Sequence, residues 1–258
     1  MSYSPSRVRH MPARALRSAG RLTGVALLAG AGLGLAGQAL AGRPLSTDDP
    51  NTADTGTCQV ELWTERSRGR ADGSTVLAPA CGLAPGLELG VEHRWARPGQ
   101  DLRASAGLGL KWGPDFAQRK TALGPLALGL KLALGYDRPA AAGWRHNGLG
   151  LLALAVLQPT EQLQLLANLG PVRDAASGSA TTQLNLALAW TPLPAALLFA
   201  ETQANDRPAS AGATVNTLGG RWWLLPEHLG LDLSASRAAG SGLGTRWSLG
   251  LGWYGIGW

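Results

Sequence analysis

The sequence predicts an all-β protein: a closed antiparallel transmembrane β-barrel of about twelve strands, with a short N-terminal periplasmic arm. Three features predict it. Large apolar and small residues alternate with a period of two over long segments. The junctions between these segments alternate between tight turns and longer polar loops. The chain also ends in an aromatic-rich strand, RWSLGLGWYGIGW, whose last residue is Trp258.

The alternation is clearest in residues 124–137, GPLALGLKLALGYD. Large apolar residues occupy every second position from Leu126 to Tyr136, and small residues and Lys131 lie between them. A helix would repeat its apolar residues at three and four positions, whereas a period of two places them on one face of a strand. The same alternation occurs in residues 105–113, 161–170, 182–190, 228–236 and 246–253.

Turn residues divide the chain into about twelve candidate strands, most of them long enough to cross a bilayer at a tilt. They are 57–67, 74–82, 85–96, 101–112, 122–137, 147–157, 161–171, 180–191, 195–205, 214–225, 228–238 and 243–258. Short junctions such as 83–86 and 191–194 lie on one side, and longer polar ones such as 137–147 on the other. This layout is typical of outer-membrane barrels. Junction 113–122 falls on the short-turn side and is too long for it.

The composition favours lipid around the leucine face. Only 16% of the residues are charged, whereas soluble domains are nearer a quarter. The opposite face of most strands is small or weakly polar, which suits a lumen better than a solvated surface. Tryptophans near strand ends, Trp95, Trp112, Trp190 and Trp253, are in phase with the leucines and fit interfacial aromatic girdles. Core tryptophans of a soluble sandwich are the alternative.

Residues 1–41 resemble a secretory signal peptide. Five arginines precede an apolar run that ends in Ala39-Leu40-Ala41, a small-x-small cleavage pattern. An uncleaved membrane anchor is the alternative. Cleavage would lower the net charge from +6 to +1, because 18 Lys+Arg would remain against 17 Asp+Glu. The mature chain therefore has no basic footprint for nucleic acid.

The sequence has two cysteines, Cys58 and Cys81, which is the minimum for a disulfide, and an exported protein can form such a bond. A turn signal between them would place them opposite each other across a hairpin; two buried free thiols are the alternative. Residues 42–56 are polar and lack alternation, which predicts a periplasmic arm or a plug-like tail. At the other end, Tyr254, Ile256 and Trp258 resemble the C-terminal signal read by the outer-membrane assembly machinery, with a bulge expected between Trp253 and Tyr254.

The start of the mature chain, RPLSTDDPNTADTGTCQVELWTER (43–66), resembles proteobacterial proteins of the phenol-degradation meta-pathway outer-membrane family. The matching residues are Arg43, Pro44, Leu45, Thr47, Asp48, Asp49, Gly56, Glu61 and Glu65, and the Lys-Trp pair at 111–112 also fits. The resemblance implies an outer-membrane location and the passage of hydrophobic or aromatic molecules.

With the leucines facing out, the alternation predicts a set of polar residues that line the lumen. They are Glu61, Glu65, Glu88, Glu92, Arg94, Arg103, Lys111, Lys131, Gln164, Asn168, Asn185, Asp232 and Arg246. These charges either set the selectivity of a conduit or fill the lumen as mutually satisfied ion pairs.

Three functions follow from this reading. The first is an outer-membrane channel or transporter for small molecules, in contact with the lipid bilayer and lipopolysaccharide. The second is a closed structural barrel, which is favoured if the lumen charges pair and the arm plugs it. The third, a lipid-modifying enzyme, would need a Ser-His pair at the rim. The scattered histidines His93, His146 and His228 favour no catalytic or metal site, and no cofactor is predicted.

Overall fold

The computed structural model describes residues 44–67, 73–97, 101–206, 214–239 and 244–258. The predicted signal peptide and its cleavage site lie outside the described residues. Among the described residues, no helix is long and apolar enough to span a membrane.

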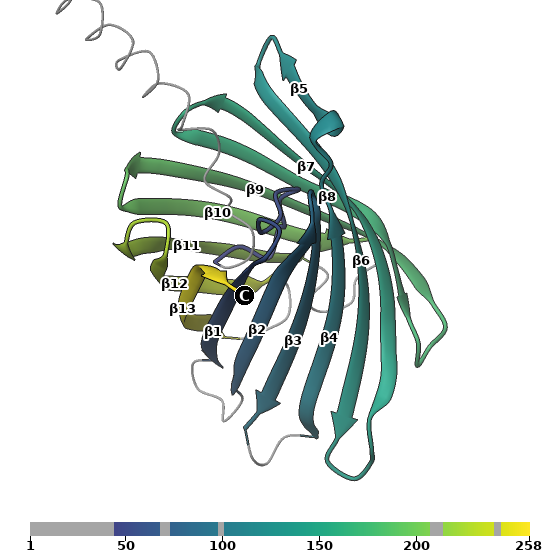
Figure 1. Ribbon diagram of the computed structural model, residues 1–258. Helices are drawn as coiled ribbons and strands as arrows, with labels where there is room; N and C mark the ends of the chain where they lie inside the picture. Colours follow the sequence, from purple (N-terminus) through teal and green to yellow (C-terminus); the bar gives the residue numbers. More distant parts are fainter. Residues whose placement is uncertain (1–43, 68–72, 98–100, 207–213, 240–243) are drawn as a thin grey trace, which may run out of the picture. The chain divides into compact units, whose positions relative to one another are not determined.

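Twelve antiparallel strands close into a barrel (Figure 1), because β1 pairs with β13 and β4 pairs with β6. The bounds of these strands are β1 Thr57–Ser67, β2 Gly73–Ala84, β3 Leu87–Ala96, β4 Leu102–Trp112, β6 Gly124–Pro139, β7 Arg145–Thr160, β8 Leu163–Asp174, β9 Ala180–Leu193, β10 Ala196–Asn205, β11 Thr214–Leu225, β12 Leu229–Ala238 and β13 Arg246–Gly257. The predicted fold class and strand number are confirmed.

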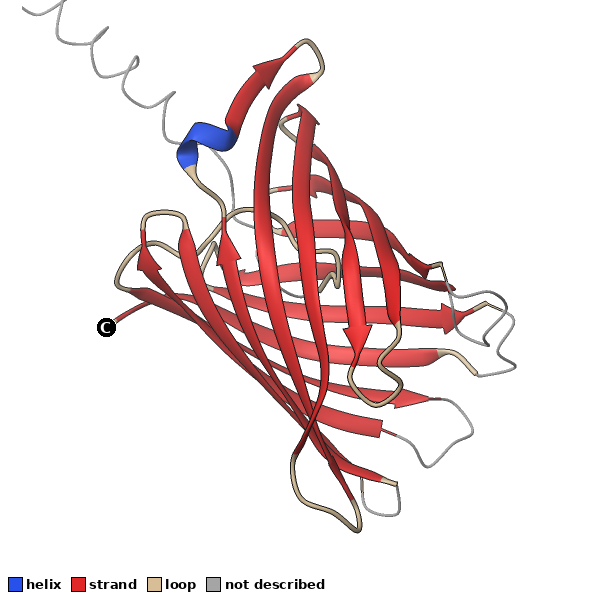
Figure 2. Cartoon of the chain, turned by 90° about the vertical axis from the view of Figure 1, so that its right-hand side faces the viewer, coloured by secondary structure: helices blue, strands red, loops and turns tan. Residues whose placement is uncertain are grey.

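Junction 113–122 differs from the prediction of a plain turn. It holds a 3-10 turn, η1 (Asp115–Ala117), and a short strand, β5 (Gln118–Thr121), which pairs only with the beginning of β6. The resulting hairpin projects beyond the ring of strands (Figure 2). This is where the extra residues of the junction go. We call the barrel end that carries this hairpin, the C-terminus and the short junctions the turn end, and the opposite end the loop end.

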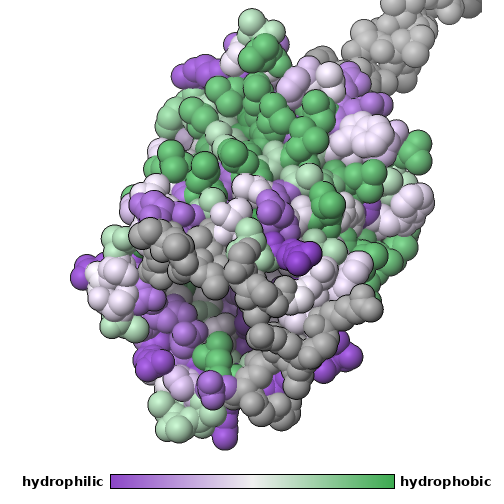
Figure 3. Space-filling model, turned by 180° about the vertical axis from the view of Figure 1, so that it is seen from behind, coloured by the Kyte–Doolittle hydropathy of each residue, from purple (hydrophilic) through white to green (hydrophobic). Residues whose placement is uncertain are grey.

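The outer face is apolar over most of its height, as the alternation predicts. Leucines such as Leu130, Leu151 and Leu186 are 43%, 49% and 46% exposed. The four girdle tryptophans are also exposed on this face, Trp95 near the loop end and Trp112, Trp190 and Trp253 near the turn end. In Figure 3, hydrophobic residues cover much of the outer surface, and hydrophilic residues gather at the loop end around a hollow. An apolar belt between aromatic girdles is the surface that a bilayer requires.

The C-terminal strand departs from the predicted phase. Tyr254 is buried and faces inward, where its hydroxyl donates a 2.6 Å hydrogen bond to Glu61 Oε1. Two residues of β13, Tyr254 and Gly255, oppose one residue of β1, and Gly255 has a φ of 71°. A positive φ suits glycine, which has no Cβ to clash. The bulge therefore lies one residue later than expected, and Tyr254 does not share a face with Ile256.

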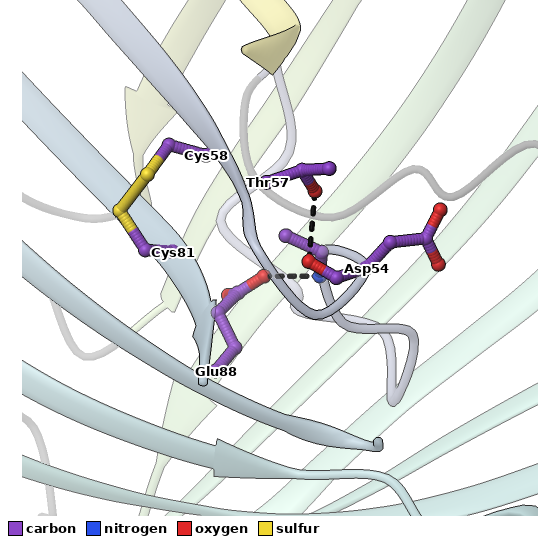
Figure 4. Close-up of a disulfide and its surroundings, with 6 residues drawn as sticks. Asp54, Thr57, Cys58, Cys81 and Glu88 are labelled. Atoms are coloured by element: carbon purple, nitrogen blue, oxygen red, sulfur yellow. Dashed lines mark hydrogen bonds between the residues drawn. A yellow bond between two sulfur atoms is a disulfide. The ribbon is translucent and has the colours of Figure 1, made fainter. Parts of the chain in front are cut away.

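Cys58 and Cys81 are direct cross-strand partners on β1 and β2 and form a disulfide (Figure 4). They alternate with the inward-facing residues Gln59 and Gly82, so the disulfide lies on the outer face near the turn end. The predicted disulfide is present, and it ties the first two strands together without entering the lumen.

Candidate functional site

The lumen is occupied by the N-terminal arm, which we define as residues 44–56. The arm precedes β1 and lies inside the ring of strands, in the half nearer the turn end (Figure 1). Thr47 and Asp49 are each 1% exposed, and Leu45 is 4% exposed. A polar segment without secondary structure is this well buried only if the barrel wall satisfies its polar groups.

Asp48 makes the largest number of these contacts. Its carboxylate forms an ion pair with Lys131 of β6 and another with Lys111 of β4, at 3.5 Å. Its backbone is clamped by the Asn168 side chain of β8: the Asp48 amide donates to Asn168 Oδ1 at 2.8 Å, and Asn168 Nδ2 donates to the Asp48 carbonyl at 2.7 Å. One arm residue therefore connects three strands of the wall.

The two ends of the arm are held by further wall residues. Glu201 of β10 accepts hydrogen bonds from the Ser46 amide, at 3.2 Å, and from the Thr47 amide and hydroxyl. At the other end, the Ala53 amide donates to Glu88 of β3 at 2.8 Å (Figure 4). The arm thus crosses from the β3 side of the lumen to the β10 side.

Leu45 anchors the arm by apolar contact. It joins a buried cluster on the inner face of β7–β10, formed by Val156, Leu166, Ala187, Ala189, Leu197 and Phe199, with Ala127 packed against it. Burying a leucine side chain is worth roughly 1.5–3 kcal/mol. This local reversal, apolar residues facing into the barrel, is explained by the arm.

Glycines make room for the arm on the wall. A Cβ at Gly113 would overlap the carbonyl oxygen of Pro50, and a Cβ at Gly82 would overlap the carbonyl oxygens of Ala53 and Asp54. A Cβ at Gly129 would lie 2.8 Å from Pro50 Cβ. The small residues opposite the leucines in 124–137 therefore have a structural role: they accommodate the arm.

The adjacent arm carboxylates Asp48 and Asp49 lie in different electrostatic surroundings. Burial raises the pKa of Asp48, but Lys131 and Lys111 outweigh it and hold that pKa well below its usual range. Burial raises the pKa of Asp49 to about 7, opposed by Lys111 and reinforced by Asp48. The Asp49 Oδ1 atom accepts a hydrogen bond from the Asn51 amide at 2.8 Å, and Oδ2 is buried without a hydrogen-bond partner among the described residues.

A second polar cluster fills the lumen beside the arm, on β1 and β11–β13. The buried guanidinium of Arg221 donates to both carboxylate oxygens of Asp232, at 2.7 and 2.9 Å, and lies 3.8 Å from Glu61. It also lies 5.0 Å from the ring centre of Trp223 and 4.8 Å from that of Tyr254. The buried charges of this cluster are thus paired.

The loop-end half contains a cavity of about 440 Å3, which we call the vestibule. Amide and carboxylate side chains from β6–β10 line one side, namely Asp137, Asn147, Asp174, Gln183, Gln203 and Asn205. At the same end, β1 carries Glu65, β3 carries Arg94 and β13 carries Arg246. Arg94 lies 2.8 Å from Glu65, and Arg246 lies 3.8 Å from it. This mixed polar lining can bind a hydrophilic solute.

The predicted lumen residues fall into three groups. Glu88, Lys111, Lys131 and Asn168 contact the arm or its partners, Glu61 and Asp232 belong to the Arg221 cluster, and Glu65, Glu92, Arg94 and Arg246 lie together near the loop end. Asn185 is buried, and Gln164 is half-buried on the inward phase of β8. Arg103, on the inward phase of β4, is exposed near the loop end at a register shift between β4 and β6.

Sequence reasoning missed Glu201, Arg221 and the inward role of Tyr254. On β10, Glu201 alternates with the outward-facing Leu198, and on β11, Arg221 alternates with the outward-facing Trp222. The period of two, applied to these strands, would therefore have placed both Glu201 and Arg221 inside. The three histidines are dispersed: His93 packs on Trp95 and Trp144, His146 packs on Tyr136, and His228 Nδ1 lies 2.9 Å from the Pro226 carbonyl. Within the described ranges, no cluster of His, Cys, Asp or Glu could hold a metal ion.

Known structures share this barrel. The KdgM porin aligns with a TM-score of 0.56 at 11% identity, over 76% of this chain and 98% of that one. The NanC porin aligns with a TM-score of 0.59 at 9% identity, over 75% and 98%. The outer membrane phospholipase A of Escherichia coli gives a TM-score of 0.47 at 12% identity, over 76% and 92%. At these identities the likeness to the two porins shows the fold alone.

The sequence comparisons are narrower. No protein with curated annotation matches the chain, and the resemblance to the phenol-degradation family is not confirmed. A family model described as uncharacterised conserved protein UCP029691 matches residues 31–247. Because this match spans most of the sequence, the chain belongs to that family.

Proposed function

We propose that the protein is an outer-membrane channel that its own N-terminal arm closes, and that it passes small hydrophilic solutes when the arm leaves its seat. The observation that carries this proposal is the contrast between an arm held by polar contacts in one half of the lumen and an open polar vestibule in the other. The porin fold and the lipid-facing outer surface support an outer-membrane location, with the turn end in the periplasm and assembly by the outer-membrane machinery.

The seat of the arm is built from reversible contacts. Ion pairs and hydrogen bonds from Lys111, Lys131, Asn168, Glu88 and Glu201 hold it, and glycines shape the wall behind it. A barrel with a purely structural role could fill its lumen with wall side chains, as the Arg221 cluster does. Here a segment that is separate from the wall fits a site on the wall through non-covalent contacts, and this arrangement favours a gating role for the arm.

The lining of the vestibule favours a particular class of solute. Four amides, two aspartates (Asp137 and Asp174) and one arginine line it, and the guanidinium group of Arg94 lies against Glu65 and Glu92. KdgM, a porin of the same fold, is known in complex with oligogalacturonate, an acidic saccharide. The acidic side of this vestibule disfavours such an anion. We therefore favour neutral hydroxyl-rich or cationic solutes over the hydrophobic or aromatic molecules that the family resemblance implied.

A closed structural barrel is the second candidate, and the filled turn-end half is the observation that favours it. A non-enzymatic role is part of the same proposal, since the described histidines His93, His146 and His228 lie apart from one another.

Single-channel conductance in a planar bilayer separates these two candidates. Asp48→Lys would face Lys111 and Lys131 with a like charge and expel the arm. Asp54→Lys makes the same charge change in the same arm at an exposed position, and serves as the matched control. We expect long closed periods for the wild type and the control, and steady salt-dependent conductance for Asp48→Lys. A folded Asp48→Lys barrel with an exposed arm and no conductance would contradict the channel and leave the structural barrel.

A further inference from the structure

Four arginines mark the outer surface at the loop end. Arg66, Arg138, Arg173 and Arg237 are each the penultimate residue of a strand that runs toward this end: β1, β6, β8 and β12. All four are exposed. Their cross-strand partners include the outward-facing Trp247 for Arg66 and Leu149 for Arg173. Because directly paired residues share a face of the sheet, these side chains project outward, next to the apolar belt.

These arginines have no internal counterion in the part of the chain that the structure describes. None of the four forms an ion pair within 4.0 Å of a described carboxylate, in contrast to Arg94, Arg221 and Arg246. Exposed carboxylates lie at both ends: Asp101 and Asp206 at the loop end, and Asp115, Glu161 and Glu227 at the turn end, where the exposed basic residues Arg119 and Lys120 lie on the projecting β5 hairpin. A basic rim at one membrane interface fits a leaflet with anionic headgroups.

The same outer surface has an apolar groove of about 750 Å3 across β6–β11. Small side chains form its floor, Ala155, Ala167 and Ala200, and leucines such as Leu157, Leu188 and Leu218 form its sides. A row of directly paired residues runs from Ala155 through Ala167, Leu186, Thr202 and Asn216 to Arg237. The groove therefore leads, residue by residue, to one of the four arginines.

We propose that this surface binds lipid A of lipopolysaccharide, with headgroup phosphates on Arg173 of β8 and Arg237 of β12 and an acyl chain in the groove. One guanidinium group can donate two parallel hydrogen bonds to two oxygens of the same phosphate. This planar geometry favours phosphate over a diffuse negative charge. Burial of acyl methylenes in the groove adds an apolar contribution. The site lies on the outer wall, so it does not depend on whether the lumen conducts.

The test uses the chain from residue 42 onward, refolded in detergent and free of lipopolysaccharide. Native mass spectrometry and titration measure the binding of lipid A and of its bis-dephosphorylated form. The variant is Arg173→Gln/Arg237→Gln, and the control is Arg119→Gln/Lys120→Gln, which removes the same charge at the opposite end. We expect the wild type and the control to prefer lipid A over the dephosphorylated form, and the variant to lose at least about tenfold in affinity for lipid A.

The groove has its own matched pair. Ala200→Phe would fill the groove, whereas Ala153→Phe adds the same ring to the exposed outer face of β7, outside the residues that line the groove. We expect Ala200→Phe to weaken the binding of both lipids and Ala153→Phe to leave it unchanged. Equal affinity of the wild type for lipid A and its dephosphorylated form would overturn the proposal. So would unchanged binding in the arginine variant, with folding of each variant verified by heat-modifiable gel mobility.

Discussion

The two halves of the lumen have walls made by the same twelve strands but differ in what fills them. In the turn-end half, Asp49 and Lys111 are 1% and 3% exposed, and Lys111, Lys131 and Arg221 each have a carboxylate partner. In the loop-end half, Arg246 and Glu92 have side chains that are 51% and 43% exposed, beside the vestibule. The strands alone thus enclose a hollow, and a separate segment closes it.

The largest expected effect on the difference between the two halves comes from a substitution that fills the space occupied by the arm. Gly113→Ala would place a Cβ against the backbone carbonyl group of Pro50, which cannot rotate away. The three atoms nearest to this Cβ all belong to Pro50, so the clash falls on the arm and not on the wall. We expect the arm to leave its seat, so that the amide protons of Thr47 and Asp48 lose protection from hydrogen exchange. The control Gly109→Ala lies on the same inner face of β4, where a Cβ would meet only Lys131 Cε, at 3.5 Å. Equal protection in both variants would show that the arm is not held by shape.

Removing one buried charge should have the next largest effect. Lys111 compensates both Asp48 and Glu88, so Lys111→Met leaves two carboxylates with fewer partners in a buried site. Breaking a buried pair in this way costs about 3–5 kcal/mol. Urea unfolding in lipid vesicles measures the change in the free energy of unfolding.

The matched substitution in the open half is Glu92→Gln. Glu92 lies 3.7 Å from Arg94 and is substantially exposed, and exposed pairs contribute about 0–1 kcal/mol. A similar loss of stability in the two variants would contradict the difference between the halves.

The sequence was sufficient to predict the barrel, because a period of two specifies the face of each residue and turn residues specify the strand ends. Lys111, Lys131 and Asn168 were found inside for this reason. The same rule failed where the backbone departs from regular pairing. The bulge at Tyr254 and Gly255 returns Ile256 to the outer face, opposite Cys58, whereas Tyr254 follows the alternation inward.

The seat of the arm could not be predicted from sequence to the same degree. Residues 44–56 have no periodicity, and their partners are distant along the chain: Asn168 is 120 residues from Asp48 and Glu201 is 154 from Thr47. Such contacts depend on barrel closure, which no local pattern encodes. The unused signal was the glycines at 82, 113 and 129, which leave space on the inner face for another segment.

The smallest predicted effect concerns pH and Asp49, the arm carboxylate without a cationic partner of its own. Lys111, Asp48 and Glu88 are the charged groups that act on it, and burial dominates, raising its pKa from 3.8 to about 7 in the seated arm. A raised pKa means that seating favours the protonated acid. The penalty for seating the arm is therefore absent below the pKa of the released arm, grows between about pH 4 and 7, and is constant above 7.

We therefore expect the ratio of open to closed time to rise with pH by at most about tenfold per unit, and to level off above pH 7. Asp48 adds no slope from pH 5 to 8, because it is ionised in both states: its pKa lies well below its usual range in the seated arm and returns to the ordinary aspartate range on release. Asp49→Asn, a neutral isostere, should close the channel more firmly at pH 8 and remove the slope. Single-channel recordings from pH 5 to 8 measure both. A slope that persists in Asp49→Asn would assign the pH dependence to the exposed carboxylates of the vestibule, and so to the open half of the lumen rather than the closed one.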